Sequence, residues 1–272
     1  MNELIFRCFA SGSSGNCYYL GSRKEGILID CGISARQIRS NLFEMGLDFR
    51  QIAGVLITHD HADHIRAVGT IGERFHVPIY ATPEIHAGID SNYGVFEKLR
   101  TSRKFYTKGE PFEILGMTVN TFTISHDSTD CVSYVIDVDG ERFMIATDVG
   151  SVDQTLLDNV ATANHLVIEA NHDEQMLLNG PYPSYLKSRI LSDKGHMSNS
   201  TCAEVLCTAY HKGLKNVYLC HLSQENNNPE VAYNTIKEKL EKTHNIVVGQ
   251  DLNLAVLERL TASPIYKLKS GV

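Results

Sequence analysis

Apolar residues in the first third of the chain recur with two different periods, which predict short strands alternating with helices. Apolar positions three and four apart predict one helix over 34–47, with Ser34 as its N-cap, and another over 64–75. Short apolar runs predict the strands between them, at 17–22, 26–32, 54–59 and 77–82. The chain is therefore expected to begin with alternating strands and helices.

The rest of the chain is richer in strands and contains a strong hairpin signal. Asp139 and Gly140 separate two apolar runs within 133–148, as in a two-residue hairpin turn. The strands fall in two sets, each followed by helices, which indicates an α/β fold with two mixed sheets packed face to face and helices outside. The other predicted strands are 117–125, 165–170, 216–222 and a last pair around 246–249 and 253–260; the predicted helices are 152–163, 199–213 and 228–244.

Composition is that of a soluble globular protein. Of 272 residues, 43% are hydrophobic and 21% are charged. No run approaches the about 18 apolar residues of a membrane span, and no signal peptide is expected from the first ten residues. The seven cysteines form no C-x-x-C pair, which favours free thiols and a cytoplasmic location. Since no low-complexity linker or repeat is found, residues 1–272 are expected to form a single domain.

The net charge of −7 argues against a broad basic face for nucleic acid. It does not exclude a local positive site, because two bound divalent metal ions would add four charges where they sit. The oligomeric state is left open by the sequence.

Three histidines and two aspartates crowd the stretch ITHDHADHI, residues 57–65. The stretch follows a predicted strand and precedes a predicted helix, and ligands often converge on such a strand-end loop. Side chains two residues apart in an extended segment point the same way, so one ion can be reached from two of them. We interpret His59, His61, Asp63 and His64 as metal ligands; the alternative is a polar loop that caps the next helix.

Further donor residues follow apolar runs later in the chain. His126, Asp148 and His221 each come directly after a predicted strand. Singly, each is also typical of a turn or a cap. Jointly, they supply the donors that a two-metal site still lacks after the first motif, so we predict that they are ligands.

These motifs resemble those of the metallo-β-lactamase superfamily, and the resemblance spans nearly the whole chain. It implies an αββα sandwich and a pair of metal ions that share Asp148. Nitrogen and oxygen donors suit zinc and also permit manganese or iron. True β-lactamases of the main branch carry a cysteine at the position of Asp148. The aspartate here therefore favours hydrolysis of a substrate other than a β-lactam antibiotic. The implied ligands are His59, His61 and His126 for one ion and Asp63, His64 and His221 for the other, with Asp30 supporting the ligands from behind.

The stretch 192–205 carries the strongest indication of the substrate. His196 precedes a predicted helix that Ser198 or Ser200 would cap, and the free N–H groups of a helix start can hold a phosphate. The segment is similar to the G-H-[ST] motif of phosphodiesterase relatives, which implies phosphate contacts from His196, Ser198 and Asn199. The alternative is a surface histidine in a turn.

Glu169 lies at the end of a predicted strand in the string IEANHD. The resemblance implies that it orients or charges His196, forming a carboxylate–histidine pair with acid–base potential. A cap on the following helix is an equally good interpretation. We therefore predict Asp148, His196 and Glu169 as the catalytic residues and keep the capping alternative for Glu169.

Several strings together narrow the resemblance to the YycJ/WalJ group of bacterial metallo-β-lactamase-fold proteins: SGSSGNC, THDHADHI, EANHD, KGHMSN and HLSQENN. The resemblance implies a nuclease that acts on DNA as a 5′-to-3′ exonuclease, with a metal-bridging hydroxide as nucleophile. Three alternatives stay open: a phosphodiesterase for small substrates such as cyclic nucleotides, a thioester hydrolase, and a regulator that binds metal without catalysis.

Overall fold

The computed structural model describes residues 3–269, which divide into two compact units. No helix in this part of the chain is long and apolar enough to cross a membrane. All seven cysteines are buried free thiols. The first unit contains residues 3–121, 128–132 and 259–269, and the second contains residues 122–127 and 133–258.

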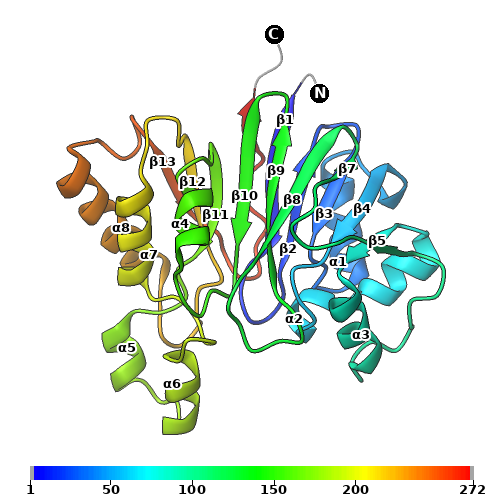
Figure 1. The fold of residues 1–272 in the computed structure, drawn as a ribbon, viewed down its shortest axis with the longest axis horizontal. Helices are drawn as coiled ribbons and strands as arrows, with labels where there is room; N and C mark the ends of the chain where they lie inside the picture. Colours follow the sequence, from blue (N-terminus) through cyan, green and yellow to red (C-terminus); the bar gives the residue numbers. More distant parts are fainter. Residues whose placement is uncertain (1–2, 270–272) are drawn as a thin grey trace. The chain divides into compact units, whose positions relative to one another are not determined.

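A mixed seven-stranded sheet forms the core of the first unit, in the order β14-β1-β2-β3-β4-β5-β6 (Figure 1). Strands β14 to β3 pair antiparallel, and β3 to β6 pair parallel. The first three strands in the sequence are buried along their whole length, including Arg7 within β1. The strands are β1 Leu4–Ala10, β2 Cys17–Gly21, β3 Gly26–Ile29, β4 Ile52–Leu56, β5 Ile79–Ala81, β6 Arg103–Phe105 and β14 Tyr266–Lys269.

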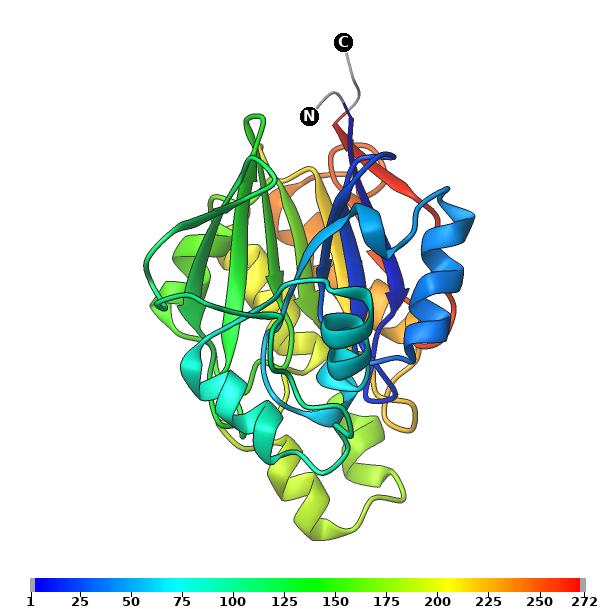
Figure 2. The same cartoon turned by 90° about the vertical axis from the view of Figure 1, so that its right-hand side faces the viewer.

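Three of the described helices of the first unit begin at a side-chain cap, formed by Ser34, Asp48 and Thr82. Ser34 and Gln37 form a capping box at the start of α1, which buries Ile38 and Leu42. Figure 2 shows α1, in blue, beside β1 and β14. The helices are α1 Ala35–Glu44, η1 Phe49–Gln51, α2 Ala62–Ile65, η2 Thr70–Arg74 and α3 Pro83–Ser91, and the unit also contains β7 Phe112–Ile114 and the start of β8 Met117–Thr123.

Some predicted boundaries in the sequence are wrong. The helix expected over 64–75 starts at Ala62, and its second part, η2, is a π-helical stretch. Residues 246–249 form no strand and contribute only an isolated bridge from Val248 to Leu252.

The second unit is built on a sheet with the order β13-β12-β11-β10-β9 (Figure 1). Strands β9 and β10 form the predicted hairpin, and its turn residues Asp139 and Gly140 have φ of 51° and 81°. The other pairs are parallel, so β10, β11 and β12 end at the same edge. The strands are β9 Val132–Val138, β10 Glu141–Ala146, β11 His165–Glu169, β12 Asn216–Cys220 and β13 Asn253–Val256.

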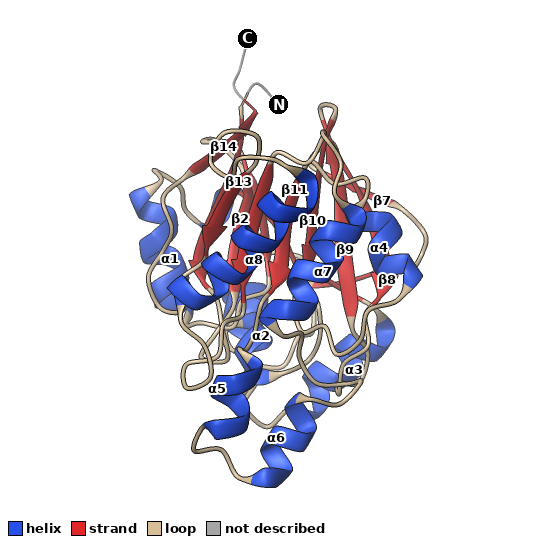
Figure 3. Ribbon diagram, turned by 90° about the vertical axis from the view of Figure 1, so that its left-hand side faces the viewer, coloured by secondary structure: helices blue, strands red, loops and turns tan. Residues whose placement is uncertain are grey.

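Three helices pack on this second sheet, and two lie beyond the carboxyl ends of its strands. Figure 3 shows α4, α7 and α8 covering one face of the sheet, with α5 and α6 below the strand ends. The carboxyl edge of the parallel strands is therefore where functional loops collect. The helices are α4 Gln154–Val160, α5 Glu174–Asn179, α6 Ser184–Ile190, α7 Asn199–Ala209 and α8 Pro229–His244.

Candidate metal-binding residues

The first unit brings together the four donors of the first motif at the end of β4 and the start of α2. The ring centroids of His59 and His61 are 4.7 Å apart, and those of His59 and His64 are 4.0 Å apart. The Nε2 atom of His64 lies 3.6 Å from Oδ2 of Asp63. His59 and His64 are fully buried. Imidazole nitrogens and carboxylate oxygens are common ligands of zinc in proteins, so this group of side chains is suited to bind it.

Asp30, which the resemblance placed behind the ligands, forms hydrogen bonds with His64 and Thr58. Its Oδ2 accepts hydrogen bonds from Nδ1 of His64 at 2.7 Å and from the Thr58 hydroxyl at 2.9 Å, and its Oδ1 accepts from the Thr58 amide. Burial raises the pKa of Asp30, and the bonds from His64 and Thr58 oppose that rise. The bond from Nδ1 of His64 to Asp30 orients the ring, as carboxylates commonly do behind a metal-ligating histidine.

Asn16 is a supporting residue that sequence reasoning missed. Its Nδ2 lies 3.0 Å from Nε2 of His64 and donates to the carbonyl of Gly12 at 3.1 Å. The Gly12 amide donates back to Oδ1 of Asn16 at 2.8 Å. Asn16 belongs to the string SGSSGNC, which contributed to the family resemblance. Nothing in the string indicated that the asparagine would contact a histidine.

Gly32 allows the β3 end to approach the metal motif. A Cβ atom at this position would overlap the backbone carbonyl of Asp63, which cannot rotate away. We expect Gly32→Ala to lower the free energy of unfolding by about 1–3 kcal/mol, because the clash forces the backbone to shift. Urea unfolding would check this expectation, and an unchanged midpoint would contradict it.

Removing the negative charge of Asp30 is expected to weaken metal binding. We expect Asp30→Asn to reduce zinc affinity by about 10–100-fold, as is usual for a group that orients a ligating histidine. Competition with a chromophoric chelator would measure the affinity. The control is Asp48→Asn, which changes a half-buried aspartate at the start of η1 in the same unit. Equal affinities of the two variants would contradict the expected role.

The second unit gathers three histidines around one carboxylate oxygen. Oδ1 of Asp148 lies 3.7 Å from Nε2 of His126, 3.5 Å from Nε2 of His221 and 3.7 Å from Nδ1 of His196. Its other oxygen, Oδ2, accepts from the Thr147 hydroxyl at 2.7 Å. The distances to His126 and His221 exceed those of hydrogen bonds but suit donors that share an ion. The predicted ligands of this unit therefore converge.

The Nδ1 atoms of two of these histidines are held by acceptors behind them. His126 donates to the carbonyl of Gly195 at 3.1 Å, and His221 donates to Oε1 of Glu169 at 3.0 Å. These bonds fix the tautomer that leaves Nε2 unprotonated, which is the usual arrangement behind a metal-ligating histidine.

Glu169 connects His196 and His221. Its Oε1 accepts from Nδ1 of His196 at 2.8 Å and from His221, and its Oε2 accepts from the amides of Val149 and Met197. Burial raises the pKa of this carboxyl, but the charge of His196 and the bonds from both histidines outweigh burial and hold the pKa at about 2. Glu169 is therefore an ionised acceptor that orients both rings.

The two capping expectations have different outcomes. Ser198 caps α7, and its hydroxyl accepts from the Thr201 amide at 3.1 Å, as predicted. Glu169 does not cap the helix that follows it, because α5 is capped by Asp173, whose side chain accepts from the Met176 amide. The interpretation of Glu169 as the partner of His196 is the one that the contacts favour.

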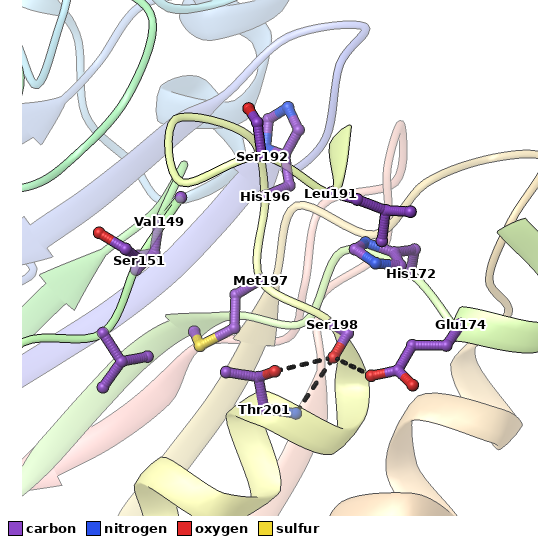
Figure 4. A pocket seen from close by; sticks show the side chains of 12 residues that line it. Val149, Ser151, His172, Glu174, Leu191, Ser192, His196, Met197, Ser198 and Thr201 are labelled. Carbon is purple, nitrogen blue, oxygen red and sulfur yellow. Dashed lines mark hydrogen bonds between the residues drawn. The ribbon is translucent and has the colours of Figure 1, made fainter. Parts of the chain in front are cut away.

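A cavity of about 150 Å³ lies beside His196 and Ser198 (Figure 4). His172, to which the sequence assigned no role, also lines the cavity, and its two buried ring nitrogens have no hydrogen-bond partner among the described residues. Asn199 is buried and donates its side-chain amide to Asn227 at 3.0 Å. Contact of Asn199 with a phosphate stays a prediction.

Asn171 is a second supporting residue that the sequence did not identify. Its side-chain amide donates to the carbonyl of His221 at 2.9 Å and lies 3.4 Å from Nδ1 of the same residue. The string EANHD contained the asparagine, but nothing in the sequence said which strand end it would contact.

Three predicted site residues have backbones in the left-handed region. Asp30, Asp148 and His221 have φ of 58°, 57° and 55°. Such a conformation costs a residue other than glycine about 1–3 kcal/mol and is concentrated at functional sites. Each of the three directly follows a strand or lies just beyond its end, where the turn aims the side chain at its partners.

Comparison with known proteins identifies the family. The Beta-lactamase superfamily domain matches residues 25–222, which is more than half of the chain. The chain belongs to this superfamily. Its similarity to the metallo-beta-lactamase fold protein YhfI from Bacillus subtilis has a TM-score of 0.66 at 15% identity and covers 97% of this chain and 99% of that one. The predicted fold class, the αββα sandwich, is confirmed.

Two relatives place the chain in one group within the superfamily. Exodeoxyribonuclease WalJ of Streptococcus pneumoniae serotype 2 is 33% identical over 270 residues, which cover 98% of this chain and 100% of the relative. Exodeoxyribonuclease YycJ of Bacillus anthracis is 32% identical over 240 residues, covering 88% and 90%. The predicted membership in the YycJ/WalJ group is confirmed.

Proposed function

We propose that this protein is a metal-dependent DNA exonuclease that shortens DNA from the 5′ end. The observation that carries the proposal is the similarity to two exodeoxyribonucleases over most of the chain, together with a set of histidine and aspartate donors in each unit. The donors lack cysteine, and His196 and Ser198 stand beside them as groups suited to a phosphate. Cytoplasmic DNA is the expected substrate.

The two units are proposed to form a single hydrolase domain, residues 1–272, whose donors hold two divalent ions. Imidazole and carboxylate ligands suit zinc best and also accept manganese or iron. Two bound ions would lower the pKa of a shared water and stabilise negative charge developing on a phosphate. The proposed ligands are His59, His61, Asp63, His64, His126, Asp148 and His221.

His196, oriented by Glu169, is proposed to bind the phosphate and to act as the general acid. Glu169 holds Nδ1 of His196 at 2.8 Å, so Nε2 of the ring is the atom that faces away from this acceptor. From there His196 can donate to a phosphate oxygen or protonate the departing oxygen. The α7 start, capped by Ser198, would add backbone N–H donors for the same phosphate.

End-labelled DNA tests the proposed function. Purified protein with quantified metal content is incubated with single- and double-stranded DNA labelled at either end, with zinc or manganese supplied separately. The proposal predicts immediate release of a 5′ label and stepwise shortening of 3′-labelled strands. Intact DNA together with hydrolysis of a cyclic nucleotide or a thioester would overturn it.

A further inference from the structure

Two aromatic side chains stand almost fully in solvent on the segment after α3. Tyr93 is 97% exposed and Phe96 is 95% exposed, while Val95 and Leu99 on the same segment are 3% and 1% exposed. The buried pair anchors the backbone and leaves the aromatic pair outside. Large apolar side chains held outward in this way indicate a binding surface. We call residues 92–104 the aromatic segment.

The aromatic segment is held in place by hydrogen bonds to the half-buried side chain of Glu73 rather than left as a free loop. The carboxylate of Glu73 accepts hydrogen bonds from the backbone amides of Arg100, Thr101 and Ser102. The bond from the Arg100 amide is the largest cause that lowers the pKa of Glu73 to about 2. A segment fixed in this way loses little conformational entropy when it binds a ligand.

The aromatic segment is attached directly to the metal motif. The side-chain amide of Asn92 donates to the backbone carbonyl of Asp60 at 3.2 Å, and Asp60 stands between His59 and His61. A Cβ atom at Gly88 of α3 would overlap the Asp60 carboxylate, so the helix and the motif are in close contact. Whatever binds the segment is therefore brought to the predicted ligands of this unit.

Positive charge accompanies the exposed aromatics, although the protein as a whole is acidic. The aromatic segment contains Lys98, Arg100, Arg103 and Lys104 and one carboxylate, Glu97. Glu97 pairs with an arginine outside the segment, at 2.7 Å from Arg74. The exposed Arg100 and Lys104 are thus available to phosphates.

We propose that Tyr93 and Phe96 form a stacking platform for the bases of an unpaired DNA end, while Arg100 and Lys104 contact its phosphates. Exposed aromatic rings beside cationic side chains are the combination with which proteins hold single strands without reading their sequence. The inference rests on the proposed function and deepens it, because it names a single-stranded end as the form of DNA delivered to the metal motif.

Alanine variants of the two aromatics test the platform. We expect Tyr93→Ala and Phe96→Ala each to weaken the binding of an oligothymidylate by about tenfold, the usual effect of losing one stacked base. Turnover of thymidine 5′-(p-nitrophenyl phosphate), which is too small to span the platform, should stay unchanged. Tyr93→Phe and Phe96→Tyr should restore binding. Phe43→Ala is the control, since Phe43 is 81% exposed on α1 of the same unit.

A 2-aminopurine base placed near the 5′ end gives a direct signature of stacking. Its fluorescence should be quenched on binding to the wild type and to the Phe43→Ala variant, and not on binding to the double variant of Tyr93 and Phe96. Equal affinity and equal quenching for all proteins would overturn the platform.

Binding is measured on metal-free protein, so the outcome is independent of catalysis. If the wild type cleaves no DNA but binds single strands through Tyr93 and Phe96, the proposed function fails and the platform stands. If the wild type degrades DNA and the variants bind and degrade it equally well, only the platform fails.

Discussion

Replacing Asp148 with alanine is expected to remove bound metal and DNA degradation together. Nε2 of His126 and Nε2 of His221 lie 3.7 and 3.5 Å from one oxygen of this buried carboxylate, so its loss removes the carboxylate that would share an ion with both rings. Metal ions stabilise the transition state of hydrolysis by several kcal/mol, so their loss is expected to lower the rate by about 10³-fold or more. Metal analysis of the purified variant and nucleotide release from labelled DNA measure the two effects.

The control for Asp148→Ala is Asp158→Ala, which removes an exposed aspartate from α4 of the same unit. This variant should keep both its metal content and its activity. A metal-replete Asp148→Ala protein, or one that degrades DNA at the wild-type rate, would contradict the role of Asp148.

Replacing His196 with alanine is expected to lower the turnover rate while leaving the metal content unchanged. The ring is bound through Nδ1 to the ionised Glu169, which leaves its other nitrogen for the substrate. The loss of such an acid–base group typically lowers the turnover rate by about 10²–10⁴-fold. The variant should bind the same amount of metal as the wild type.

The matched control for His196→Ala is His211→Ala, because His211 also lies in the second unit and bonds backbone groups at Ala163 and Gly213. Turnover by His196→Ala equal to that of the control would contradict the proposed role. Loss of metal from His196→Ala would instead assign the ring to the ligands.

The candidate site could be predicted largely because its residues follow strands. Asp148 and His221 each come within two residues of the end of an apolar strand, and parallel strands bring their carboxyl ends to one edge. The link between Glu169 and His196 came from the family resemblance, and the contacts decided between it and a cap. Local pattern therefore predicted where the candidate donors lie, and their role as ligands stays a prediction.

The parts that could not be predicted depend on contacts between distant residues. Asn16 and Asn171 support His64 and His221, but an asparagine in a loop is also an ordinary turn residue. Strand β14 was not predicted because its four residues are too few for a clear alternation of apolar and polar side chains. It forms a strand by pairing with β1 at the other end of the chain. Burial and pairing at such separations leave little local signal.

Metal titration of the apoprotein tests the central claim most directly. Nucleotide release from 5′-labelled DNA is measured while zinc or manganese is added to protein stripped by a chelator, beside His61→Ala from the first unit and Asp148→Ala from the second. The account predicts no release without metal, full release near two equivalents, and failure of both variants. Release by metal-free protein, or by either variant at wild-type level, would contradict a two-metal DNA exonuclease served by both donor sets.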